Sequence, residues 1–204
     1  MKKQLFIVGN APLSRDLSSE VDAADYVVRF NEPSKPFGLS GTRTDLLMLV
    51  TSGKAAQRHV QDPQFLLTPT FRAAREVMFV YHPSIIRRYH PKPNILSRLK
   101  GHRDDWTMQT IEVVGNAGKP IRIMPPEFYI DGCLELGITE ENMRKIFPST
   151  GFLGIWHMLK QCPAEDWDIR ICGFTWQGWK RHAWTAERAW VERHMETGRI
   201  IKVD

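Results

Sequence analysis

Long hydrophobic runs are missing from this sequence. The longest apolar stretches, such as residues 46–50, fall far short of the ~20 residues that a membrane-spanning helix needs. The segment at residues 1–8 is basic and then briefly apolar, but Gly9 and Asn10 interrupt it before it reaches the length of a signal-peptide core. We therefore expect neither a membrane span nor a secretory signal, and we interpret residues 5–8 as a first buried strand.

Cysteine is scarce and follows no metal-binding pattern. The three cysteines (Cys133, Cys162 and Cys172) are an odd number, and no CxxC pair or zinc-type spacing occurs. This usage suits reduced thiols in a cytoplasmic protein and makes a cysteine metal site unexpected. The Gly-x-Gly-x-x-Gly fingerprint and the Walker loop with its lysine are also absent. The sequence thus excludes a classical dinucleotide site and a P-loop.

The composition is that of one folded domain. The chain has 204 residues, of which 42% are hydrophobic and 25% charged, so it is neither disordered nor of low complexity. Its formal net charge of +5 is too small to predict nucleic-acid binding. The charge indicates either an ordinary solvated surface or a preference for anionic ligands. We expect a single domain over residues 1–204.

Short apolar runs alternate with amphipathic stretches along the chain. Such alternation is typical of an α/β domain, in which a mostly parallel twisted sheet is flanked by helices. The predicted strands are residues 5–8, 26–30, 46–50, 77–81, 121–124 and 169–172.

Two asparagines follow the first two predicted strands. Gly9 and Asn10 form a turn after residues 5–8, where ligands meet the carboxyl ends of strands in open α/β sheets, although an ordinary tight turn explains them as well. Asn31 ends the second strand. Its amide suits a hydrogen bond to a base or ribose, and it suits equally an Asx turn before Pro33.

A helix with an open first turn is predicted after residue 148. Ser149 or Thr150 is a candidate N-cap, and apolar residues recur at helical spacing as far as Leu159. Gly151 leaves the N–H groups of the first turn accessible, as in phosphate-binding helices. An ordinary capped core helix remains the alternative, and we expect His157 to be a packed or surface histidine.

His182 lies in a loop just before a helical run that continues to Gly198. A histidine can act as a general base near neutral pH, and we expect Lys180 and Arg181 to lower its pKa and keep the imidazole neutral. A loop histidine without a catalytic role is the alternative. The tryptophans around it suit either core packing or a platform for a sugar.

Asp166 and Asp168 have the Asp-x-Asp form that holds a metal on a sugar diphosphate. They come just ahead of a predicted strand and not at its carboxyl end. We therefore do not favour a metal role for them.

Taken in order, these segments resemble the motifs of the family 29 sialyltransferases. Residues 8–10, 25–31 and 41–45 are similar to the large sialylmotif, and residues 148–162 with 168–174 are similar to the small one. His182, four residues and then Glu187 match the very small motif. The similarity runs from about residue 5 to the C-terminus and is loose from about residue 55 to 115.

The resemblance implies a single Rossmann-like domain, a GT-A variant. It also implies an inverting, metal-independent transfer of a nonulosonic sugar, sialic acid or a Kdo-type relative, from a CMP-sugar to a glycan or glycolipid hydroxyl. No cofactor is expected, and the basic net charge suggests an anionic acceptor.

Carried over by position, the resemblance gives roles to eight residues. His182 would be the general base, and Glu187 would position the loop or helix. Outside the resemblance, Lys180 or Arg181 would supply a contact to the donor phosphate, and Gly9 would support the first turn. The residues implied in nucleotide binding are Asn10, Asn31, Ser149, Thr150, Gly151 and Gly173.

Two departures from the family pattern keep other functions open. The large-motif cysteine would fall near Leu5 and is missing, so Cys162 has no disulfide partner. The third motif, which opens with a second histidine, has no counterpart after Phe174, where Trp176 and Trp179 stand instead. One alternative is therefore a CMP-binding accessory protein without turnover. Another is a metal-dependent sugar-diphosphate transferase that uses Asp166 and Asp168.

Overall fold

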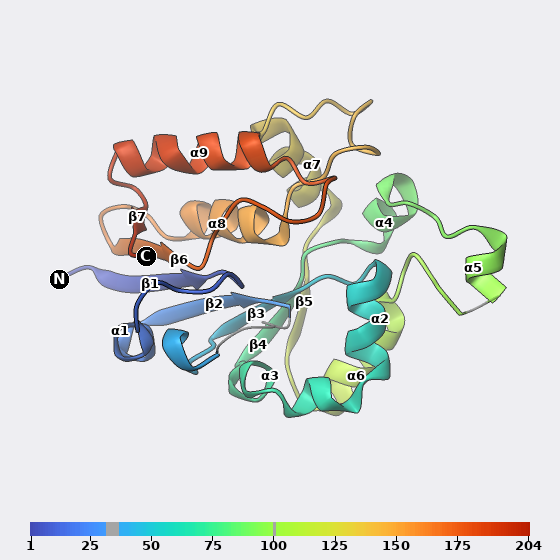
Figure 1. The fold of residues 1–204 in the computed structure, drawn as a ribbon, viewed down its shortest axis with the longest axis horizontal. Coiled ribbons are helices and arrows are strands. Elements are labelled where there is room, and N and C mark those ends of the chain that lie inside the picture. Colours follow the sequence, from blue (N-terminus) through green and yellow to red (C-terminus); the bar gives the residue numbers. More distant parts are fainter. Residues whose placement is uncertain (32–36, 100) are drawn as a thin grey trace.

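The computed structural model describes residues 1–31, 37–99 and 101–204. They form one seven-stranded, all-parallel sheet in the order β5-β4-β3-β2-β1-β6-β7, with helices on both faces (Figure 1). The strands are β1 (Lys3–Val8), β2 (Tyr26–Phe30), β3 (Leu46–Leu49), β4 (Glu76–Phe79), β5 (Ile121–Ile123), β6 (Trp167–Cys172) and β7 (Ile201–Lys202). The six predicted strands are confirmed. The two-residue strand β7 was missed because it is too short to show a pattern.

The helices lie in the connections between the parallel strands. They are α1 (Ser18–Ala23), α2 (Gly53–Gln61), α3 (Pro69–Ala73), α4 (Pro83–Tyr89), α5 (Ile95–Leu99), α6 (Thr107–Asn116), α7 (Pro126–Glu135), α8 (Thr150–Gln161) and α9 (Trp184–Glu196). Two short 3₁₀ helices, η1 (Phe37–Ser40) and η2 (Pro63–Leu67), complete the connections. No helix in the described part of the chain is long and apolar enough to span a bilayer.

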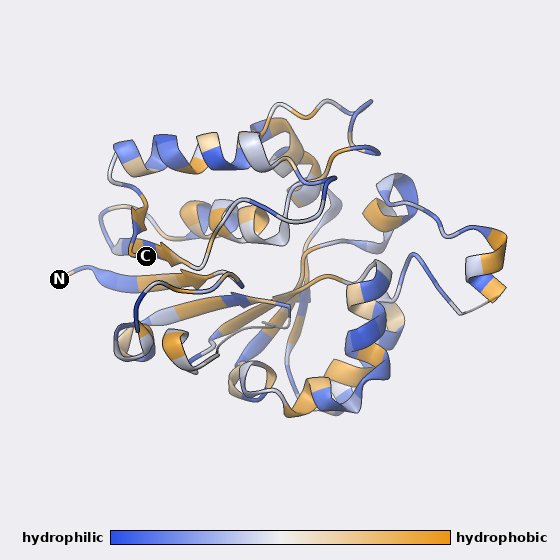
Figure 2. Ribbon diagram, in the orientation of Figure 1, coloured by the Kyte–Doolittle hydropathy of each residue, from blue (hydrophilic) through white to orange (hydrophobic). Residues whose placement is uncertain are grey.

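Both faces of the sheet are buried, which explains why the strands are apolar throughout. Along β1, Leu5 and Ile7 belong to the core under α7, α8 and α9, whereas Phe6 and Val8 pack with residues of α1 on the other face. Alternate side chains of a strand point to opposite faces, so a strand covered on both sides reads as a continuous apolar run. Figure 2 shows hydrophobic colour along the central strands.

The order of the strands reverses at β1. From β1 the chain builds β2 to β5 toward one edge, and it then returns to place β6 and β7 on the other side of β1. Val8 at the end of β1 is in register with Arg29 of β2 and Cys172 of β6. The residues that follow these three strands therefore meet at one place. In open α/β sheets this switch point is where ligands bind.

Candidate active site

Two glycines pack against each other at the switch point. Gly9 follows β1 and donates its N–H to the Cys172 carbonyl, and Gly173 follows β6 with a positive φ of 71°. A Cβ atom on Gly9 would lie 2.2 Å from the Gly173 carbonyl oxygen, closer than any real contact. Both residues must therefore be glycine for the ends of β1 and β6 to approach this closely.

The two asparagines fix the turns after β1 and β2. Asn10 donates from Nδ2 to the Phe30 carbonyl at 3.0 Å, and the Oδ1 atom of Asn31 accepts from the Val50 N–H at 3.0 Å. The expected alternative for Asn31, an Asx turn toward Pro33, involves a residue outside the described ones. Asn31 has φ 48°, and its Nδ2 atom has no partner among the described residues. This amide can therefore donate to a ligand.

Ser149 caps α8 and is held in turn by a buried carboxylate. Its Oγ atom accepts from the Phe152 N–H at 3.0 Å and donates to Glu187 Oε2 at 2.6 Å, while its own N–H donates to Glu187 Oε1 at 2.7 Å. The N-cap prediction is confirmed. Because its one hydroxyl proton is used, Ser149 has no side-chain donor left for a phosphate.

Glu187 is fully buried in the first turn of α9, so it joins the starts of two helices. Burial raises the pKa of its carboxyl group to about 7, and the hydrogen bonds from Ser149 oppose that shift. Glu187 lines neither of the two cavities described below. Its contacts are those of a positioning residue.

The first turn of α8 presents free backbone donors. The N–H groups of Thr150 and Gly151 have no partner in residues 1–31, 37–99 and 101–204. A Cβ atom on Gly151 would come within 2.8 Å of the Phe174 ring, so glycine keeps this turn open beside the loop after β6. Free N–H groups and the helix dipole together favour an anion at this position.

His182 is oriented by the chain just ahead of α8. Its Nδ1 atom lies 3.2 Å from the Phe147 carbonyl oxygen, which can only accept, so Nδ1 carries the proton in the neutral ring. Nε2 is then the unprotonated nitrogen. The rings of Trp179 and Trp184 contact the imidazole edge-on, with centroids 5.1 and 4.9 Å away. The arrangement leaves Nε2 able to accept a proton.

The pKa of His182 is lowered, as expected, but not by the cause we expected. Burial lowers the pKa below its ordinary value of 6.5, and the hydrogen bond to Phe147 opposes the shift. Attributing the shift to Lys180 and Arg181 was wrong. Arg181 donates to the carbonyls of Arg144 and Lys145 and lies over the Phe147 ring.

A cavity of about 330 Å³ opens at the switch point. Eight residues proposed from the sequence line it, although they come from five separate segments of the chain. They are Gly9, Asn10, Asn31, Ser149, Thr150, Gly151, Gly173 and His182. The rest of the wall had no site role assigned from the sequence, and it consists of Ala11, Phe30, Phe174, Thr175, Trp176, Gln177 and Trp184. We call this space the smaller cavity.

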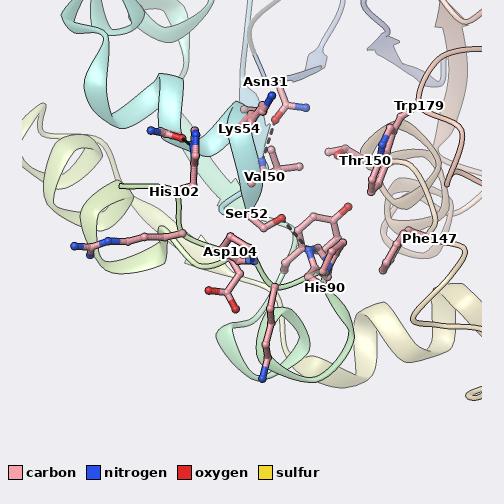
Figure 3. A pocket seen from close by; sticks show the side chains of 18 of the residues that line it. Asn31, Val50, Ser52, Lys54, His90, His102, Asp104, Phe147, Thr150 and Trp179 are labelled. Atoms are coloured by element: carbon pink, nitrogen blue, oxygen red, sulfur yellow. Dashed lines mark hydrogen bonds between the residues drawn. The ribbon is translucent and has the colours of Figure 1, made fainter. Parts of the chain in front are cut away.

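A larger cavity of about 770 Å³ lies beside it (Figure 3). Asn31, Thr150 and His182 line both cavities. Most of the rest of the larger cavity comes from α2 and from the chain between α4 and α6, including Lys54 and His90. His182 thus stands where the two spaces meet, with a fixed tautomer and a lowered pKa.

His90 and Tyr81 were missed by the sequence analysis. His90 hydrogen-bonds Ser52 Oγ at 2.9 Å, and burial lowers its pKa to about 4, so this second histidine is neutral. Tyr81 lines the same cavity, and burial raises the pKa of its hydroxyl group. Both residues belong to the stretch where the family resemblance is loose, and no local pattern links them to His182. Only the fold brings them together.

Besides Glu187, three residues that were proposed from the sequence line neither cavity: Arg181, Asp166 and Asp168. Arg181 is engaged with backbone carbonyls, and so it does not replace the phosphate contact of the missing third motif. Asp168 pairs in register with Gln4 near the beginning of β1, so it lies at the amino-terminal end of the strands, whereas the cavities lie at their carboxyl ends. Asp166 precedes it in the chain. The described residues contain no group of three potential metal ligands.

The fold has known counterparts. The structure of a mammalian sialyltransferase matches 99% of this chain and 69% of its own, at 15% identity and a TM-score of 0.58. An α-2,3-sialyltransferase from Campylobacter jejuni matches 98% of this chain and 75% of its own, at 11% identity and a TM-score of 0.58. This is the sialyltransferase fold. The single-domain α/β prediction is confirmed as to fold class.

A protein with a different description is similar in sequence. A "Urease operon 23 kDa accessory protein" from Rhizobium meliloti (strain 1021) is 25% identical over 207 residues, which cover 98% of this chain and 92% of that protein. No family model matches the chain. A further solved structure, the sialyltransferase CstII from Campylobacter jejuni with the substrate analogue cytidine-5′-monophosphate, shares the fold at 12% identity and a TM-score of 0.54.

Proposed function

We propose that the protein is a CMP-sugar glycosyltransferase that moves a nonulosonic sugar to a glycan or glycolipid hydroxyl. One observation carries the proposal: His182, with Nε2 free to accept a proton, lines both the smaller and the larger cavity. A donor in one space and an acceptor in the other would meet at this imidazole. The sialyltransferase fold and the described complex of one such enzyme with cytidine-5′-monophosphate support the choice of donor.

The smaller cavity offers what a cytidine monophosphate needs. The free N–H groups of Thr150 and Gly151 suit the phosphate at the start of α8, and the Asn31 amide suits a base or ribose oxygen. A departing CMP carries less charge than a nucleoside diphosphate. Backbone donors aimed at that charge can stabilise it in the transition state without a divalent metal.

The reaction is a single displacement with inversion. His182 Nε2 takes the proton of the acceptor hydroxyl, whose oxygen forms a bond to the anomeric carbon of the donor sugar. The bond from that carbon to the phosphate oxygen breaks, and its electron pair leaves with CMP. The transition state resembles an oxocarbenium ion, and help from a general base is typically worth ~10² to 10⁴ in rate.

The larger cavity is the acceptor side of this proposal. Its lining carries Lys54, Lys92 and Arg103 against one carboxylate, Asp104. Figure 3 shows Lys54 and Asp104 on the side of the cavity away from Phe147. This excess of positive charge favours a glycan that bears a carboxylate or phosphate.

The first experiment is a calorimetric titration with CMP, CDP, UDP and GDP, with and without Mn²⁺. A ligand that binds only the native state also raises its thermal stability by mass action. We expect a metal-independent preference for CMP. Mn²⁺-dependent binding of UDP or GDP would instead favour the sugar-diphosphate alternative. In that case the variant Asp168→Asn should no longer bind the nucleotide.

The second experiment separates binding from chemistry. We expect His182→Ala to lower transfer at least ~100-fold while CMP affinity stays within a few fold, because a general base acts on the chemical step. His194→Gln is the matched control, since His194 lies outside both cavities. Burial lowers the pKa of His182 below its ordinary value of 6.5, so the imidazole becomes protonated only below that pH. In the parent protein, kcat/KM should therefore fall only as the pH drops below 6.5. Parental transfer by His182→Ala contradicts the proposal.

A CMP-binding accessory role is the second candidate. The similarity to a urease operon accessory protein over 98% of this chain favours it, as does the missing third motif. Tight CMP binding together with no transfer and no donor hydrolysis, across a panel of CMP-sugars and glycan acceptors, would establish this reading over the transferase.

A further inference from the structure

The helix α5 exposes an unusual amount of apolar surface. Ile95, Leu96 and Leu99 leave 77, 71 and 79% of their surface uncovered, and the helix buries none of its residues. Single exposed apolar side chains are common in proteins, but three large ones on a five-residue helix form a patch. Such patches mark interaction sites.

This helix stands apart from the body of the protein. In Figure 1, α5 lies at the margin of the molecule, joined to α4 and α6 by extended connections, and Figure 2 shows hydrophobic colour on it. We call the described residues 90–99 and 101–103 the α5 arm. No element among residues 1–31, 37–99 and 101–204 buries its apolar side chains.

The α5 arm itself carries charge of one sign. From residue 77 to residue 103 the sequence contains no Asp or Glu and six Lys or Arg. Among the described residues, Lys92, Arg98 and Arg103 make no ion pair, whereas Arg88 is paired with Glu140. An apolar patch bordered by uncompensated cations is complementary to a surface that is negative outside and apolar beneath. An anionic lipid bilayer has this character.

We propose that the α5 arm docks the protein on an anionic membrane surface, with Ile95, Leu96 and Leu99 inserted among the lipids and Lys92, Arg98 and Arg103 at the headgroups. A folded partner is less suited to the patch, because a stable protein interface needs about 800 Å² from each side, far more than three side chains provide. A bilayer accepts a small wedge of this kind. The proposal does not depend on the transferase activity.

The docked orientation would bring a membrane close to the larger cavity. Lys92, Pro93, Ser97 and Arg103 of the α5 arm also line that cavity. A ligand carried on a lipid at this surface could therefore reach the cavity without leaving the membrane. This consequence connects the arm to the site, but the binding itself can be measured with empty vesicles.

The test is co-sedimentation with vesicles of phosphatidylglycerol and phosphatidylcholine, and with vesicles of phosphatidylcholine alone. We expect the parent protein to bind the anionic vesicles at least tenfold more tightly, and 0.5 M salt to weaken that binding. The variant Ile95→Ser/Leu96→Ser/Leu99→Ser should lose at least tenfold in affinity. Arg98→Gln should lose about fivefold, the worth of one cation at an anionic surface.

Matched controls guard against indirect effects. Leu134→Ser replaces an exposed leucine of α7, 58% uncovered, and should bind like the parent. Since the three substituted residues are exposed, the triple variant should keep the parental melting temperature and CMP affinity. Equal binding of parent and triple variant overturns the proposal, as does equal binding to neutral and anionic vesicles. A parent dimer that the triple variant dissociates, with no vesicle binding, would assign the patch to a second copy of the chain instead.

Discussion

The two cavities that meet at His182 are built in different ways. The smaller one combines glycines and short polar side chains at the ends of β1, β2 and β6 and at the start of α8 with four aromatic rings, those of Phe30, Phe174, Trp176 and Trp184. The larger one takes its charged side chains, Lys54, Lys92, Arg103 and Asp104, from α2 and from the chain between α4 and α6. Strand ends and helix starts fix atoms precisely, whereas long side chains on loops supply charge with less precision. This difference fits a nucleotide held in one space and a variable acceptor in the other.

We expect the largest effect on the smaller cavity from a substitution that forces the ends of β1 and β6 apart. Gly9→Ala would place a methyl group 2.2 Å from the Gly173 carbonyl, so backbone must move. We expect the free energy of unfolding to fall by more than about 3 kcal/mol, at the upper end for overpacking, and CMP binding to be lost. Chemical denaturation and calorimetry measure these effects.

Gly115→Ala is the control for that substitution. Gly115 lies inside α6, and outside that helix's own backbone the nearest atom to a new Cβ, Ile121 Cδ1, is 4.0 Å away. Alanine is the better helix former by about 1 kcal/mol, so this variant should be as stable as the parent or more so. A Gly9→Ala protein with parental stability would show that the two strand ends can separate freely.

The buried carboxylate under the smaller cavity makes stability depend on pH. The pKa of Glu187 rises from 4.5 in the unfolded chain to about 7 in the fold, so the unfolded state binds fewer protons between these values. This contribution is present below pH 4.5 and is lost as the pH rises through 7. It amounts to about 3 kcal/mol at 1.36 kcal/mol per pH unit.

The variant Glu187→Gln isolates that contribution. The free energies of unfolding of parent and variant are to be compared at pH 5, 6, 7 and 8. As the pH rises, we expect the stability of the parent to fall relative to that of the variant. A difference that stays constant over this range would mean that Glu187 does not titrate there and that Ser149 is held in another way.

A smaller effect is expected from Asn31, which we assign to nucleotide binding. We expect Asn31→Ala to weaken CMP binding by roughly 1 to 3 kcal/mol, because a ligand group loses its hydrogen-bond partner. Asn10→Ala gives a comparison at the neighbouring strand end. Unaltered CMP affinity would restrict Asn31 to its bond with Val50 and leave it out of the binding site.

The smallest effect is expected on the larger cavity. Lys54→Gln and Lys92→Gln should each weaken binding of a p-nitrophenyl glucuronide by less than about 1 kcal/mol, as exposed charges do. CMP affinity should not change. The matching glucoside lacks the carboxylate and should be indifferent to either substitution, and Lys202→Gln on β7 serves as the control. A glucoside affected as strongly as the glucuronide would contradict a charge-based acceptor preference.

Much of the smaller cavity could be predicted because its residues follow local signals. Asn10 and Asn31 directly follow apolar runs, and Ser149 precedes a helical pattern, so each is readable within a few residues. Arg181 was placed wrongly because adjacency to His182 in sequence says nothing of where its guanidinium bonds. Ser149 was predicted to contact the nucleotide, but the sequence does not show that Glu187 uses its hydroxyl proton.

The sequence by itself determined the parallel α/β class, six strands, the N-cap of α8 and the residues at the switch point, because apolar periodicity and capping act over short distances. Only the tertiary structure decided which nitrogen of His182 is free, since the Phe147 carbonyl that fixes it lies 35 residues away. It also decided that His90 and Tyr81 share a cavity with His182, and that Ile95, Leu96 and Leu99 stay uncovered. These features depend on contacts between distant segments, which a one-dimensional pattern does not encode.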